Sequence, residues 1–255
     1  MTPLRATGLT IATCVVLLGV LAPWLAPFNP TELHLNDVLT PPNATYWLGT
    51  DALGRDVLSR LLYGTRVSLS VGVVAVGLAV GLGVLVGAAA ALSRRLDAPL
   101  MRLTDVMLCF PSIFLILAVI AVLQPSLMNV MIIIGLTGWM GTARLVRAEL
   151  LSLRTRPFMD AAKLAGVRPL PLLAKHLLPN ALPPILTSAS LGLAGAILTE
   201  SALSYLGLGV QPPTPSWGAM LAEGKTVLEA AWWLITFPGL AIVTTVLAFT
   251  FAAES

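Results

Sequence analysis

The sequence predicts an all-α, polytopic membrane protein with about six transmembrane helices in a single domain spanning residues 1–255. Hydrophobic residues make up 57% of the chain and charged residues only 11%, whereas soluble domains carry about a quarter charged residues. Six apolar runs approach the length of about 20 residues that a helix needs to cross the hydrocarbon core of a bilayer. Lys and Arg gather on one side of these runs, as is typical of multi-pass membrane proteins.

The predicted spans are residues 7–27, 67–92, 104–123, 126–143, 182–206 and 231–252. The first run follows Arg5 and looks like a secretory signal peptide. It is long for the apolar core of such a peptide, however, and no clean small-residue cleavage site follows it, so we expect an uncleaved first span. Prolines inside the later spans, such as Pro111 and Pro238, are compatible with membrane helices because neighbouring helices satisfy the freed carbonyls.

The second predicted span carries two GxxxG pairs, Gly77/Gly81 and Gly83/Gly87, which allow helices to approach closely. We expect these glycines to pack against other helices of this chain. Contact with a second subunit is the alternative that the sequence leaves open.

The distribution of positive charge predicts the orientation of the chain. With the N-terminus in the cytoplasm, eleven Lys and Arg residues fall inside and four, Arg55, Arg60, Arg66 and Lys225, fall outside. We therefore expect both termini to be cytoplasmic. Five tryptophans are expected at the outer membrane interface: Trp24, Trp47, Trp217, Trp232 and Trp233.

The polar segment 144–181 contains the most informative stretch of the chain, FMDAAKLAGVRPLPLLAKHLLPN at residues 158–180. Small apolar residues recur there at helical spacing after Pro157, and Gly166 suits a helix C-terminus. Pro179 is expected to end the segment, giving two short helices joined by a turn at the cytoplasmic surface. Such a segment either docks another protein or anchors the loop in lipid headgroups.

This stretch resembles the cytoplasmic "EAA" loop of ABC importer permeases, whose pattern is E-A-A-x3-G-x9-I-x-L-P. Asp160 replaces the Glu and His176 replaces the Ile. The stretches LGTDALGRDVLSRLLYGTRVSLSVG at 48–72 and ESALSYLGLGVQPPTPSWGAML at 200–221 are similar to segments of the dipeptide, oligopeptide and nickel permease family, C-type subunit. The predicted ATPase-coupling residues are Asp160, Ala161, Ala162, Gly166, His176, Leu178 and Pro179.

The resemblance implies a permease subunit that imports di- or oligopeptides by alternating access, with nickel as the alternative cargo. The implied partners are a second homologous permease, two cytoplasmic ATPase subunits, an external solute-binding protein and membrane lipid. ATP is expected to be bound by the ATPase subunits. Family members usually continue through a polar tail, so the ending FTFAAES is expected to be short or altered.

Neither catalysis nor a resident cofactor is expected of this chain. Gly224-Lys225-Thr226 is similar to the end of a phosphate-binding loop, but Ala219 stands where the first glycine is required. Cys14 and Cys109 lie in apolar runs and imply no disulfide, and the two histidines are too far apart in sequence to indicate a metal site. We find no nucleic-acid motif.

The remaining charges are expected to be structural. Asp51/Arg55 and Asp56/Arg60 have the i,i+4 spacing of ion pairs on a solvated surface helix, with a docking face for an external protein as the alternative. The Pro-rich loop 207–218 is a rigid connection or part of an external gate. Glu200 and Asp105 are expected to be hydrated near span ends. An ion-coupled secondary transporter that uses these acids, or a non-transporting scaffold, are the rival functions.

Overall fold

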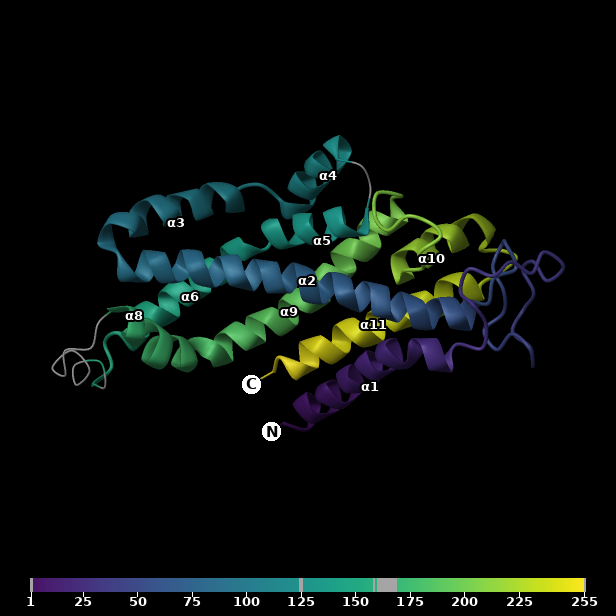
Figure 1. Ribbon diagram of the computed structural model, residues 1–255, viewed down its shortest axis with the longest axis horizontal. Coiled ribbons are helices and arrows are strands. Elements are labelled where there is room, and N and C mark those ends of the chain that lie inside the picture. Colours follow the sequence, from purple (N-terminus) through teal and green to yellow (C-terminus); the bar gives the residue numbers. More distant parts are fainter. Residues whose placement is uncertain (1, 124–125, 158, 160–168, 255) are drawn as a thin grey trace.

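The computed structural model describes residues 2–123, 126–157, 159 and 169–254, and it confirms the all-α fold over these residues (Figure 1). The helices are α1 (Pro3–Leu25), α2 (Val57–Leu92), α3 (Arg94–Leu108), α4 (Ser112–Val122), α5 (Leu127–Leu136), α6 (Trp139–Leu153), α8 (Pro169–Leu172), α9 (Leu178–Tyr205), α10 (Trp217–Gly224) and α11 (Trp233–Ala252). A π-helical turn, Leu173–Leu177, joins α8 to α9. Short 3-10 structure at Lys225–Val227 follows α10.

Five of the described helical stretches are long and apolar enough to cross a membrane. They are Pro3–Leu25, Val57–Leu92, Leu127–Leu153, Leu173–Tyr205 and Trp233–Ala252. The bent pair α3–α4 would make a sixth span, so the number agrees with the predicted six.

Helix α2, with 36 residues, lies at the centre of the bundle and packs against α1, α5, α6 and α9 (Figure 1). It begins at Val57, well before the apolar run at 67–92, because Asp56 caps it: the carboxylate accepts the Ser59 N–H at 2.8 Å. Its first ten residues mix apolar side chains with polar ones, and two of the polar ones, Ser59 and Arg60, are buried. Hydropathy therefore marks the apolar part of this helix and misses its first ten residues.

The two GxxxG pairs of α2 have different surroundings. A Cβ atom at Gly87 would lie 2.5 Å from the Ala143 carbonyl oxygen, and one at Gly83 would lie 2.6 Å from Thr142 Cβ. This pair therefore brings α6 into close contact, as expected for packing within the chain. Cβ atoms at Gly77 and Gly81 would meet no described atom within 4 Å.

The predicted span 104–123 is two helices in the structure. Helix α3 begins directly after α2 and ends at Leu108, and α4 leaves it at an angle of 82°. Pro111 lies at the break; it lacks an amide donor and disfavours helical dihedrals at the residue before it. The bend therefore has a local cause that hydropathy does not report.

Helices α1 and α11 lie side by side, and the two termini of the described chain are close together (Figure 1). At Gly8 a Cβ atom would lie 2.5 Å from the Ala252 nitrogen, so only glycine permits this approach. Figure 1 places α8 at one end of the molecule, here called the coupling end. The opposite end, called the cap end, carries residues 26–56 and α10.

The cap end has its own apolar core, which includes Val57, Met220 and Trp233. Trp233 is 3% exposed and its indole N–H donates to the Thr50 carbonyl at 3.1 Å, while Trp217 is 1% exposed. Both side chains are therefore packed inside the protein and do not face lipid headgroups. Trp24, Trp47 and Trp232 are exposed, as an interfacial position requires.

Candidate functional site

Three of the predicted coupling residues, His176, Leu178 and Pro179, lie where the π-helical turn meets α9. The Leu178 N–H donates to the Leu173 carbonyl, five residues back, which defines the turn. Asn180 Nδ2 donates to the His176 carbonyl at 2.6 Å. The other four predicted residues lie outside the described part of the chain: Asp160, Ala161, Ala162 and Gly166.

The expected end of a short helix at Pro179 is wrong, because the helix continues through this residue to Tyr205. Proline at the first positions of an α-helix loses no intrahelical hydrogen bond, and Pro179 occupies such a position directly after the π-helical turn. The π-helical turn and α9 are consequently parts of one helical rod, Leu173–Tyr205.

One face of the π-helical turn packs inside the bundle, and the opposite face is exposed. Leu177 is fully buried, whereas His176 and Pro179 are exposed. The buried residues of this cluster come from α2, α6, α8, the π-helical turn and α9, with Met159 between α6 and α8: Ala88, Ala91, Val146, Leu150, Met159, Leu172, Leu177, Ala181 and Ile185. Arg154, just past α6, donates to the Ala91 carbonyl near the end of α2. The coupling end is therefore one packed unit with an exposed polar edge.

Ion pairs attach α3 to α6 at this end. Arg147 donates through Nε and a terminal nitrogen to the two oxygens of Asp97, at 2.5 and 2.7 Å. Arg144 pairs with Asp105 at 2.8 Å on a more exposed surface, so Asp105 has a cationic partner, and its hydration stays a prediction. The bidentate pair gives α3 a defined position on α6.

A cavity of about 270 Å³ lies between α2, α4, α5, α6 and α9. It is lined by small, branched aliphatic and hydroxyl-bearing residues, and none of the described lining residues is ionisable. Gly141 and Gly195 border it, and a Cβ atom at either would meet no described atom within 4 Å. The hydroxyl-bearing lining residues are Ser112, Thr137, Thr142, Ser188 and Thr199. No pattern in the sequence indicates this lining, because it is assembled from helices that are distant in the chain.

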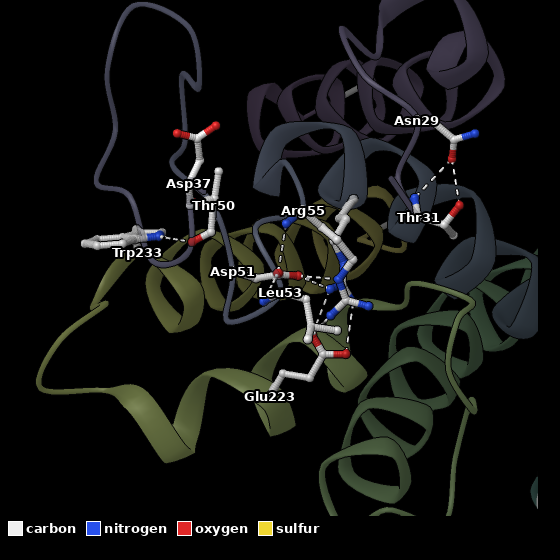
Figure 2. A network of polar contacts seen from close by, with 10 residues as sticks. Asn29, Thr31, Asp37, Thr50, Asp51, Leu53, Arg55, Glu223 and Trp233 are labelled. Atoms are coloured by element: carbon white, nitrogen blue, oxygen red, sulfur yellow. Dashed lines mark hydrogen bonds and ion pairs between the residues drawn. The ribbon is translucent and has the colours of Figure 1, made fainter. Parts of the chain in front are cut away.

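The cap end carries a buried ion network, in which Figure 2 shows Asp51, Arg55 and Glu223. Arg55 Nε donates to Asp51 Oδ2 at 2.7 Å, and a terminal nitrogen of Arg55 donates to Glu223 at 2.8 Å. Arg60 also donates to both carboxylates, and its side chain is only 2% exposed. The network therefore joins the segment before α2 to α10.

The prediction of two i,i+4 pairs on a solvated helix is wrong in two respects. Asp51 and Arg55 do pair, but they precede α2 and are buried. Asp56 caps α2, and Arg60 pairs with Asp51 and Glu223 instead. Sequence spacing missed Glu223, which lies more than 160 residues from Arg60.

Glu200 is fully buried at the junction of α2, α9 and the loop before α10. It accepts hydrogen bonds from Ser68 Oγ at 3.2 Å and Ser204 Oγ at 2.7 Å. These hydroxyls in turn accept the backbone N–H groups of Trp217 and Val210. The expected hydration of Glu200 is wrong: the carboxylate organises the loop 207–216, and it does not line the cavity described above.

Two other kinds of site were considered from the sequence: a phosphate-binding loop near Lys225 and a metal site. Neither is formed by the described residues. Lys225 lies over the Tyr205 ring, 4.8 Å from its centroid, and Glu223 belongs to the ion network. No group of three His, Cys, Asp or Glu side chains able to hold a metal ion is found within the described part of the chain.

Sequence comparisons relate the chain to transport permeases. A family model described as "Binding-protein-dependent transport system inner membrane component" matches residues 79–255. The di/tripeptide transport system permease protein of Pseudomonas aeruginosa (strain UCBPP-PA14) is 42% identical over 248 residues, which cover 94% of this chain and 82% of that protein. The dipeptide transport system permease protein of Haemophilus influenzae is 39% identical over 254 residues, covering 97% and 86%.

Structural comparison shows the same fold in a solved transporter. An inward-facing crystal form of the MetNI methionine ABC transporter matches with a TM-score of 0.64, covering 76% of this chain and 93% of that one at 19% identity. A second crystal form matches with a TM-score of 0.54 at 20% identity, covering 76% and 97%.

Proposed function

The chain belongs to the family of inner membrane components of binding-protein-dependent transport systems, as a permease subunit of an ABC importer, and we propose that its cargo is a di- or oligopeptide. The relatives reported above are named for di- and tripeptide or dipeptide transport, and they align with nearly the whole chain. Catalysis of ATP hydrolysis belongs to separate subunits in this family of transporters.

The observation that carries the cargo proposal is the uncharged, hydroxyl-lined cavity. A peptide brings an ammonium, a carboxylate and amides, and hydroxyl groups can exchange hydrogen bonds with all of them. Because no lining side chain is charged, neither terminus of the peptide would be held strongly, and passage requires weak binding. Nickel would prefer imidazole or other strong donor side chains, and the described lining has none.

We propose further that the cavity is half of a pathway completed by a second, homologous permease. Two ATPase subunits would bind the coupling ends, with contacts from Asp160, Ala161, Ala162 and Gly166 and from the exposed edge at His176 and Pro179. An external binding protein would deliver the peptide to the cap end. The charge distribution supports this orientation, with the coupling end and both termini in the cytoplasm.

An ion-coupled mechanism receives no support from the two acids first suspected. Glu200 is held by serine hydroxyls away from the cavity, and Asp105 pairs with Arg144. Both have structural contacts that account for their positions.

Filling the cavity tests the proposal. Gly195→Leu places a side chain into the cavity without meeting a described atom near its Cβ, so we expect normal assembly and strongly reduced peptide uptake. The measurement is uptake of a labelled dipeptide by cells that express the complete transporter, with complex assembly assayed in the same membranes.

Gly239→Leu is the matched control. Gly239 lies on α11, lines none of the cavity and also has no described atom within 4 Å of a Cβ position. Normal uptake in Gly195→Leu at normal assembly would contradict the assigned pathway. Uptake of nickel but not of peptides by the unmodified transporter would contradict the cargo.

A further inference from the structure

An apolar groove with a single cationic residue lies on the outside of the bundle, away from the cavity assigned to transport. It has a volume of about 440 Å³ and lies between α1, α2, α9 and α11. Its lining is Val16, Gly19, Val20, Arg66, Leu69, Ser70, Val73, Leu193 and Phe249. Arg66 is the one charged residue among these.

The groove exists because α1 approaches α2 closely at one point. A Cβ atom at Gly19 would lie 3.3 Å from Thr65 Cγ2 and 3.5 Å from the Arg66 nitrogen, so a small residue is needed there. On either side of this contact, the exposed side chains of Val16 and Val20 on α1 face the open space beside Val73 on α2. Leu69, which is 9% exposed, forms part of the floor.

The order of residues along the helices gives the groove a direction. On α2, Arg66 precedes Leu69 and Val73 and is therefore nearer the cap end. Gly19, beside Arg66, is six residues before Leu25, the last residue of α1, or about 9 Å along the helix axis. A long arginine side chain can extend over most of such a distance toward headgroups while its stem stays among apolar groups. The charge thus lies toward the membrane surface and the apolar part toward the membrane centre.

Arg66 also lacks a protein partner in the part of the chain that the structure describes. No hydrogen bond or ion pair joins its guanidinium to another described side chain, whereas Arg55, Arg60, Arg144 and Arg147 are all paired. An arginine at the edge of the hydrocarbon region needs a counter-charge, because an unpaired charge there is costly.

We propose that this groove binds an anionic glycerophospholipid of the leaflet at the cap end, with the lipid phosphate on Arg66 and an acyl chain along Leu69 and Val73. The guanidinium matches phosphate oxygens in geometry and charge. The groove is continuous with the surface that faces lipid, so no protein segment has to move for the lipid to enter. This inference does not depend on the cargo.

Lipid binding by the purified, delipidated transporter complex tests the proposal. Native mass spectrometry would measure occupancy by phosphatidylglycerol, by phosphatidylcholine and by glycerol 3-phosphate, which has the phosphate but no acyl chain. We expect specific binding of phosphatidylglycerol alone. Arg66→Ala should bind it about tenfold more weakly, as expected for the loss of a charge-assisted hydrogen bond, and Arg66→Lys should retain most of the binding.

Two further variants make the result specific to the groove. Val73→Trp fills the apolar part at an exposed position, so it should reduce binding while the complex still assembles. Arg102→Ala removes an exposed arginine of α3, outside the groove, and should leave binding unchanged. Equal binding of phosphatidylcholine, unchanged binding in Arg66→Ala or an equal loss in Arg102→Ala would overturn the proposal. A cross-link from Val20→Cys to the second permease, with no lipid retained, would overturn it as well.

Discussion

A guanidinium is expensive to bury, and Arg60 is buried with 2% of its side chain exposed. Two carboxylates from distant parts of the chain, those of Asp51 and Glu223, surround it. The Asp51 carboxylate also accepts the backbone N–H groups of Leu53 and Arg55. The charged side chains of this network therefore fix one another's positions. Ion pairs, together with apolar contacts, define the conformation of the segment before α2.

Removing Arg60 should destabilise the cap end. Arg60→Ala leaves the buried Asp51 carboxylate and the partly exposed Glu223 carboxylate with only Arg55 as a partner, and breaking a buried pair costs about 3–5 kcal/mol of unfolding free energy. We expect a clear fall in the thermal unfolding midpoint of the purified complex in detergent.

Arg144→Ala provides the comparison for Arg60→Ala. It breaks the pair with Asp105, which is about half exposed, and exposed pairs contribute about 0–1 kcal/mol. Equal midpoints for the two variants would show that the network at the cap end is not a stabilising one.

The proposed docking of residues 158–166 on an ATPase can be tested directly by substitution. If residues 158–166 dock on an ATPase, a bulky β-branched residue at Gly166 would add volume at the contact and disfavour the turn. We expect Gly166→Val and Ala162→Asp to insert normally and to lose ATPase association and uptake together, measured by pull-down and transport in the same membranes.

Ala202→Asn serves as the control for insertion and expression in this series, because Ala202 is exposed on α9 far from the coupling end. Normal association and uptake in both Gly166→Val and Ala162→Asp would remove the docking role of this segment.

Which elements could be predicted from the sequence depends on the kind of signal each one carries. Composition alone predicts the apolar helices, and α1, α9 and α11 lie close to their predicted bounds. The first turns of α2 do not, because polar residues such as Ser59 and Arg60 interrupt the apolar run there and are nevertheless buried. The break at Pro111 and the continuation through Pro179 show the same residue type with opposite results, which local hydrogen bonding decides.

The candidate site could be predicted from the sequence only in part, for the same reason. A linear motif could predict a coupling segment, since its residues are neighbours in the chain. The sequence could not predict three other features: the pairing of Glu223, the serines around Glu200 and the lining of the cavity. Each is assembled from residues that are far apart in sequence. Trp217 and Trp233 have the sequence environment of interfacial residues, and only the folded cap shows that they are core.

The cap end and the coupling end lie at opposite ends of the long axis of the molecule (Figure 1). The proposed orientation therefore makes a labelling prediction. In a background with Cys14 and Cys109 replaced by serine, an impermeant maleimide should label Thr214→Cys in intact cells. Thr155→Cys should be labelled only after permeabilisation. Both substituted residues are exposed, so accessibility differs only through the membrane. Labelling of both from one side would rule out this orientation.

The continuity of the helix from Leu173 to Tyr205 has a mechanical consequence. These 33 residues form a lever about 50 Å long, with Leu177 near one tip and Glu200 near the other. A tilt of about 5° imposed at the first tip displaces the second by about 4 Å at that length. The serine-held carboxylate and the loop fastened to it would travel with that tip. A small angular step at the coupling end is thereby converted, without any change inside the helix, into a movement as wide as a side chain at the far end.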